Sequence, residues 1–273
     1  MKTIITIFTL LLTYTLSAQN FTGKAIYKTS RKSNFKIGGN KSTMSDSQKK
    51  QIEKRLRKMN QKTFVLVFDK TTSIYKEDVK LNAPKPQVGG IRMMSFGSGN
   101  SDIYYKNLKE KRYANKTEIM GKSFLVKDSL SNFNWELTSE SKNIGNYTCY
   151  KATYTREVEN TNMSVVNGEP KEVKKKETIV TTAWYTPQVP VSNGPRNYQG
   201  LPGLILELND GRLTIVCTEI VLNPSEKIKI IEPEKGKIVN QAKFDEISEE
   251  KAKEMMERFR SKNGSGIEIR MGG

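Results

Sequence analysis

Short apolar runs with a period near two, separated by turn residues, make up most of the chain after residue 62. Alternating β-branched and aromatic residues are typical of strands with one buried face. The pattern predicts strands over Gly23–Lys28, Thr63–Phe68, Ser73–Glu77, Ile103–Asn107, Arg112–Ala114, Ser123–Lys127, Tyr147–Arg156, Thr178–Tyr185, Leu204–Leu208, Leu213–Ile220 and Lys227–Ile231.

Turn residues indicate how these strands connect. Asn209-Asp210-Gly211 predicts a hairpin between the two strands that flank it. Polar stretches predict long loops over residues 82–100, a charged hairpin tip over 160–177 and a flexible tail over 263–273. Short, evenly spaced strands favour a mainly β fold in a single domain over residues 19–262. We expect a curved antiparallel sheet, a half-barrel or open barrel, packed against one or two helices.

Two segments have helical periodicity instead. Ser45 opens a capping box, and Ile52, Leu56 and Met59 follow at helical spacing, which predicts a basic helical insertion near residues 45–60. Ser248 is the expected N-cap of a C-terminal helix near residues 248–262, whose apolar stripe would pack on the sheet.

The first eighteen residues have the form of a secretory signal peptide. A positive start precedes an apolar run over Ile4–Leu16, and small residues end at Ala18, where we expect cleavage. The alternatives are a buried helix or a membrane anchor, but the run is short for a span, which needs about 20 residues. The expected location is the periplasm or the outer-membrane periphery of a Gram-negative envelope.

The formal net charge of +17 is concentrated near the N-terminus. Residues 24–62 carry thirteen basic side chains against two acidic ones. The basic face of the expected helix is either solvated or a contact surface for an anionic membrane or glycan. Export and the absence of interleaved aromatic residues argue against nucleic acid as a partner. The anion-contact candidates are Lys49, Lys50, Lys54, Arg55, Arg57 and Lys58.

The chain contains no histidine and two cysteines, and these counts exclude several kinds of site. Histidine-based catalytic triads and histidine-ligated zinc require a side chain that is missing. No spacing singles out a Ser/Lys or a carboxylate pair, so we assign no catalytic residue, no metal site and no cofactor. Cys149 and Cys217 either form a disulfide in an oxidising compartment or remain two separate buried thiols.

The stretch from Ala183 to Glu207 is the most distinctive part of the sequence. Pro187, Pro190 and Pro195 prevent ladder pairing, which predicts an exposed connection over Val189–Gln199. Glycines on both sides of Pro202 predict a tight turn that leads into a buried strand. This segment is either a structural corner or the mouth of an apolar cavity, and the candidate mouth residues are Trp184, Tyr185, Ser192, Asn193, Gly200, Leu201, Pro202 and Gly203.

The hexapeptide Gly-Leu-Pro-Gly-Leu-Ile at Gly200–Ile205 resembles the signature of the GLPGLI family of exported bacterial envelope proteins. Trp135–Thr138, Cys149–Thr153 and Ala183–Thr186 support the resemblance. It implies an envelope location and a β fold, and it supplies no catalytic residues.

These observations favour a non-enzymatic module that binds or carries an apolar or lipidic ligand, or an accessory to an outer-membrane transporter. One alternative is an envelope scaffold that docks on anionic lipid or glycan through the basic helix. The other is a hydrolase that works without histidine. The oligomeric state is not predicted.

Overall fold

The computed structural model describes residues 21–31, 47, 61–79, 102–166, 169–226 and 228–262. The strands are β1 (Thr22–Arg31), β2 (Gln61–Asp69), β3 (Thr72–Glu77), β4 (Ile103–Asn107), β5 (Arg112–Ile119), β6 (Lys122–Ser129), β7 (Glu136–Ile144), β8 (Tyr147–Val166), β9 (Glu169–Thr186), β10 (Leu204–Asn209), β11 (Leu213–Leu222) and β12 (Lys237–Val239). Helix α3 spans Gln241–Lys262. The expected mainly β fold is confirmed.

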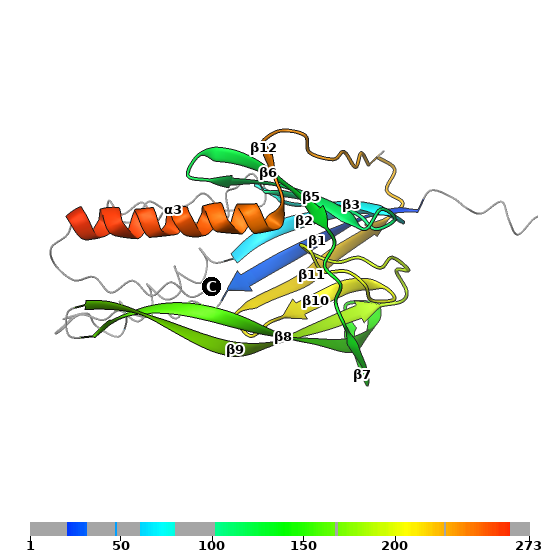
Figure 1. The fold of residues 1–273 in the computed structure, drawn as a ribbon. Helices are drawn as coiled ribbons and strands as arrows, with labels where there is room; N and C mark the ends of the chain where they lie inside the picture. The colour runs from blue at the N-terminus through cyan, green and yellow to red at the C-terminus, as the bar shows by residue number, and fades with distance from the viewer. Residues whose placement is uncertain are drawn as a thin grey trace, which may run out of the picture.

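All the strands belong to one curved, open sheet (Figure 1). Their order is β12-β6-β5-β4-β3-β2-β1-β11-β10-β9-β8-β7, so β12 and β7 are the two edges. Neighbours are antiparallel, as expected, except for β12, which pairs in parallel with β6. Strand β1 pairs with β2 on one side and with β11 on the other, so the centre of the sheet joins segments about 200 residues apart in the chain.

Most of the predicted strands are present, including the hairpin formed by β10 and β11. The prediction of a strand over Lys227–Ile231 is wrong, because residues 228–235 have no regular structure. Pro224 and Pro233 flank this segment, and a proline cannot donate to a ladder. Strand β7 was not predicted, because it is an edge strand of mostly exposed polar residues without apolar alternation.

The charged stretch over residues 160–177 is mostly strand rather than hairpin tip. Strand β8 continues to Val166, and its pairing with β9 begins again at Glu169. Ladder hydrogen bonds join backbone groups, so a polar composition did not prevent the strands from extending. The signal segment, the expected basic helix apart from Ser47, the loop over 82–100 and the tail lie outside the described residues.

Helix α3 begins seven residues earlier than predicted, at Gln241 rather than at Ser248. Asn240 is its N-cap, since its Oδ1 accepts a hydrogen bond from the backbone N–H of Lys243 at 2.9 Å. The Asp128 side chain accepts from the N–H of Gln241 at 3.0 Å. The Phe244 ring packs edge-on against Phe124 of β6, with 5.7 Å between centroids. The first turn therefore docks α3 on the sheet.

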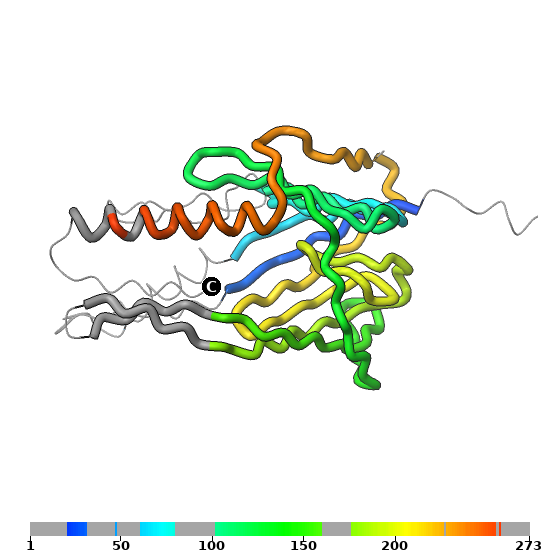
Figure 2. Tube along the Cα trace, viewed as in Figure 1, coloured from blue at the N-terminus to red at the C-terminus, as the bar shows by residue number. Residues whose placement is uncertain are grey.

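The two faces of the sheet carry separate cores. We call the face that bears Leu66 and Tyr75 the inner face, and the face that bears Ile74 and Tyr105 the outer face. Residues 130–135, here called the crossing segment, run from β6 to β7 across the inner face (Figure 2). Residues 187–203, here called the motif loop, supply Val189, Val191, Tyr198 and Leu201 to the inner core.

Candidate ligand-binding site

Two β-bulges at the same level of neighbouring strands form a cavity. In β10 the pairing with β9 skips Leu206, because Ile205 lies opposite Tyr185 and Glu207 lies opposite Trp184. In β11 the pairing with β1 skips Thr218 in the same way. Bulges locally disrupt the ladder and redirect side chains. Both inserted residues line one cavity of about 340 Å³.

The cavity has an apolar floor and a more polar rim. The turn between β7 and β8 lines one side of it. Gly145 in this turn has a φ of 59°, a conformation that glycine adopts at low cost. The side chains of Leu206 and Cys217 are buried, whereas Thr218 and Glu219 are exposed. The lining residues are Ile144, Gly145, Asn146, Tyr147, Leu206, Cys217, Thr218, Glu219 and Ile220. The lining exposes more polar than apolar surface, so it suits a small amphipathic ligand.

Cys149 and Cys217 are two free, buried thiols in the structure. Strands β9 and β10 separate β8 from β11, so the two cysteines lie on strands that are not neighbours. They are not bonded to each other in this structure. Burial raises the pKa of Cys149 to about 11 and that of Cys217 to about 12, which makes both thiols weak nucleophiles.

The motif loop is not the exposed connection that the prolines predicted. Val189 and Asn193 are fully buried, and Val191 and Leu201 are nearly so. Prolines stop ladder pairing, but they do not prevent apolar side chains from packing into a core. The backbone N–H groups of Leu204 and Ile205 donate to the carbonyls of Val189 and Asn193, both at 3.0 Å. The loop thus occupies the inner face at the place where the sequence predicted an open mouth.

The eight candidate mouth residues do not line the cavity. Tyr185, Asn193, Leu201 and Gly203 are buried, while Ser192, Gly200 and Pro202 are exposed. Trp184 is half-buried, and Lys142 lies 4.4 Å from the centre of its ring. The tight turn itself is present, with φ of 96° at Gly200 and 156° at Gly203. It leads into a fully buried Leu204-Ile205-Leu206, as expected.

Sequence reasoning missed two side chains that hold the motif loop. Lys106 of β4 donates from Nζ to the carbonyls of Gly194 at 2.7 Å and Tyr198 at 3.0 Å. Trp135, at the end of the crossing segment, donates from Nε1 to the carbonyl of Gln199 at 2.9 Å. The Phe133 ring stacks on Tyr198, with 5.2 Å between centroids. In a strand where apolar and polar residues alternate, a lysine is expected to face solvent, so the sequence does not indicate that Lys106 points inward.

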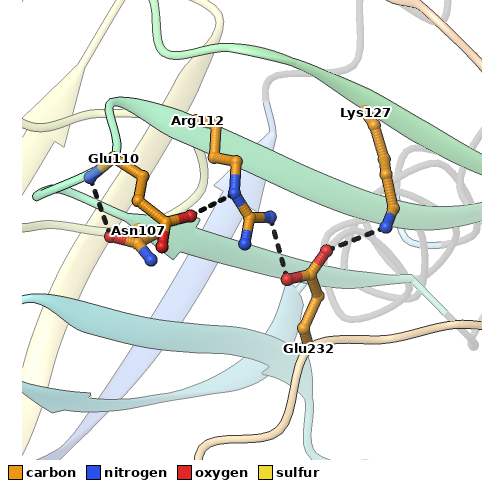
Figure 3. A network of polar contacts seen from close by, with 5 residues as sticks. All are labelled: Asn107, Glu110, Arg112, Lys127 and Glu232. Atoms are coloured by element: carbon orange, nitrogen blue, oxygen red, sulfur yellow. Dashed lines mark hydrogen bonds and ion pairs between the residues drawn. The ribbon is translucent and has the colours of Figure 1, made fainter.

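On the outer face, ion pairs add to the packing of Ile230 against the small apolar core there. The carboxylate of Glu232, in the segment between β11 and β12, pairs with Arg112 at 2.8 Å and with Lys127 at 3.0 Å (Figure 3). Arg112 also pairs with Glu110, whose N–H donates to the side chain of Asn107 at 3.0 Å. This network is partly exposed and does not line the cavity described above, so we interpret it as structural.

The described part of the chain has no group of three or more Cys, Asp or Glu side chains placed to hold a metal ion. In the same residues, no helix is both long and apolar enough to cross a membrane. The six anion-contact candidates lie outside the described residues, so the basic contact surface stays a prediction.

The motif loop and five of the nine cavity-lining residues lie within a recognisable unit of sequence. A family model for a protein of unknown function, Porph_ging, matches residues 135–207. The match runs from Trp135 through β7, β8, β9 and the motif loop to β10. No curated protein matches the chain.

Solved structures of PNGF-II in the C2 and P21 space groups are similar to the chain, with a TM-score of 0.48 for each. Sequence identity is 13% and 14%. The similarity covers 85% and 84% of this chain but 33% of PNGF-II, so the chain spans about a third of that protein's length.

Proposed function

We propose that this protein is an exported, non-enzymatic binding module of the bacterial envelope, and that it takes a small apolar or amphipathic ligand in the cavity at the β10 and β11 bulges. The observation that carries the proposal is that the two residues inserted by the bulges, Leu206 and Thr218, line the same cavity. A bulge costs ladder pairing, so two at one level favour a built feature over an accident of packing.

The size of the cavity narrows the ligand class. A volume of about 340 Å³ lies at the low end of ligand pockets, which run from roughly 300 to 1,000 Å³. Such a cavity accommodates a short acyl chain or a small ring, but not a two-chain lipid. The charged lining residue is Glu219, so we expect the polar end of the ligand to be neutral or cationic.

Export and an envelope location rest on the N-terminal segment and on the resemblance of Gly200–Ile205 to the GLPGLI family. The family model that matches residues 135–207 describes a protein of unknown function and agrees with a module without assigned chemistry. We include an outer-membrane transporter in this proposal as the partner that would receive the ligand.

Filling the cavity tests the proposal. Ile220→Trp places a large ring into the lining, whereas Val221→Trp adds the same ring at the adjacent position, which is 37% exposed and does not line the cavity. The probe is N-phenyl-1-naphthylamine, an uncharged apolar fluorophore. We expect the wild-type chain and Val221→Trp to bind it with similar affinity, and Ile220→Trp to bind it at least about tenfold more weakly, since each tenfold corresponds to about 1.4 kcal/mol.

Native mass spectrometry of the protein purified from a bacterial periplasm supplies the second measurement. A ligand mass that accompanies the wild-type chain and Val221→Trp, but not Ile220→Trp, would support the proposal. Equal probe binding by all three proteins, with no accompanying mass in any, would reject the cavity as a binding site.

A further inference from the structure

Lys106 is a fully buried cation in the inner core. Its Nζ donates to the carbonyls of Gly194 and Tyr198, at 2.7 and 3.0 Å. An ammonium group has three N–H donors, so two carbonyls leave one of them available. Carbonyl oxygens carry only partial charge and do not neutralise an ammonium ion.

No carboxylate is bonded to Lys106 among the residues that the structure describes. Asp102 immediately precedes β4 and lies four residues from Lys106, which is about 13 Å at the rise of a strand. Glu77 lies four residues along β3 from Ser73, the residue opposite Lys106, and it pairs with Lys62. Burial lowers the pKa of Lys106 well below its usual range, as expected for a cation without a counter-ion.

Two further buried polar residues neighbour Lys106 or one of its acceptors, Gly194. Ser73 of β3 lies directly opposite Lys106 in the register, and its side chain is fully buried. Directly opposite residues have Cβ atoms about 4.5–5.5 Å apart. Asn193 is also fully buried and immediately precedes Gly194, whose carbonyl accepts from Lys106. Its Oδ1 accepts from the N–H of Gly194 at 2.8 Å.

The Oγ of Ser73 and the Nδ2 of Asn193 are buried without a hydrogen-bond partner. Unpaired buried polar atoms are rare in native proteins, because each one loses its hydrogen bonds to water without replacing them. The amide nitrogen of Asn193 can only donate, the Ser73 hydroxyl can donate, and the Lys106 ammonium has one N–H left. Three unused donors on neighbouring residues, one of them carrying an uncompensated positive charge, favour an acceptor that carries negative charge.

We propose that a small monovalent anion of chloride size binds between Lys106, Ser73 and Asn193. The anion would accept hydrogen bonds from all three side chains and supply the missing counter-charge. Because Asn193 and Gly194 belong to the motif loop, anion binding would fix that loop against β3 and β4. These three residues do not line the cavity described above, so this site is independent of the proposed function.

Bromide tests the site directly, because it replaces chloride and scatters X-rays anomalously. We expect crystals grown in sodium bromide to show an anomalous peak within hydrogen-bonding distance of Lys106 Nζ, Ser73 Oγ and Asn193 Nδ2. Density for water alone at that position, without an anomalous peak, would overturn the proposal.

Thermal unfolding in solution separates binding from general salt effects. Sodium bromide should raise the melting temperature by about 5 °C more than sodium gluconate at equal ionic strength, since an ion that binds only the native state stabilises it. Ser73→Ala removes one donor and should reduce this difference, whereas Ser123→Ala, at an exposed serine of β6, should leave it unchanged.

Asn193→Asp supplies the negative charge covalently and keeps an oxygen for the N–H of Gly194. We expect this variant to be at least as stable as the wild-type chain at low salt and to lose the bromide effect. A destabilised Asn193→Asp variant, or equal melting temperatures of the wild-type chain in bromide and gluconate, would reject the anion site.

Discussion

Two long connections without regular strands pack on opposite faces of the sheet, and they are held by different forces. The motif loop, residues 187–203, buries Val189, Val191 and Leu201 in the inner core and is tied by Lys106 and Trp135. The outer segment, residues 223–236, leaves Ile231 66% exposed, packs only the partly buried Ile230 against the small outer core, and is tied by the ion pairs of Glu232. A proline-rich connection can therefore be core or surface, depending on which side chains meet the sheet.

Gly203→Ala should have the largest effect, because it combines strain with a clash. The backbone φ of Gly203 is 156°, and an added Cβ would lie 2.2 Å from the carbonyl oxygen of Thr186. We expect a loss of about 4 kcal/mol in the free energy of unfolding. Gly211→Ala is the matched control, since its φ is 85° with open space around it, and it should cost about 1 kcal/mol. Urea titration measures the free energy of unfolding of both variants. Equal losses would contradict a tightly packed turn at Gly203.

Leu201→Ala tests whether the motif loop is part of the core. Its side chain is 1% exposed, so truncation should lower the free energy of unfolding by about 3 kcal/mol. The same truncation at Ile231 of the outer segment should change it by less than about 0.5 kcal/mol. Chemical denaturation of the two variants compares the two connections directly. Similar losses in the free energy of unfolding would contradict the view that the motif loop is core and the outer segment is surface.

Tyr27→Phe removes one buried hydrogen bond to the strand that follows the motif loop. The Tyr27 hydroxyl donates to the carbonyl of Ile205 at 2.8 Å in the fully buried core. We expect a loss of about 1.5 kcal/mol, because the carbonyl remains buried without this donor. Tyr150→Phe, at a tyrosine that is 39% exposed, serves as the control and should be nearly neutral in the same measurement.

Glu232→Gln should have the smallest effect and the clearest dependence on conditions. A partly exposed ion pair contributes about 0.2–1 kcal/mol, and salt screens it. Burial alone would raise the pKa of Glu232, but the hydrogen bonds from Arg112 and Lys127 outweigh burial and hold that pKa below its usual range. A depressed folded-state pKa means that the stabilisation is present at neutral pH and is lost as the pH falls through the carboxylate range.

The difference between the wild-type chain and Glu232→Gln should therefore shrink below about pH 4 and in high salt. Melting curves between pH 3 and pH 7 measure it. A difference that stays constant over this range would show that the outer segment is held by packing rather than by charge.

The cavity illustrates what sequence patterns miss. The stretch Gly200–Ile205 was correctly identified as distinctive, and its turn and buried strand were predicted. The cavity instead uses Leu206, one residue beyond that motif, together with Thr218 of the next strand. A bulge is a mismatch in the pairing of two strands, so it cannot be read from the sequence of either strand alone. The position of Lys106 was also unpredictable, since which face of β4 points inward depends on its neighbours.

The sequence by itself determined the class of fold, most of the strands and the turn at Gly200–Gly203, because alternation and turn residues act over a few positions. Only the tertiary structure decided which connection fills the inner face, where helix α3 begins and where a cavity remains. These depend on contacts such as Lys106 with Gly194 and Asp128 with Gln241, which join residues about 90 to 110 positions apart. Local sequence patterns do not identify such partners. The side chains become buried and meet their partners only once the sheet has curved and brought distant residues together.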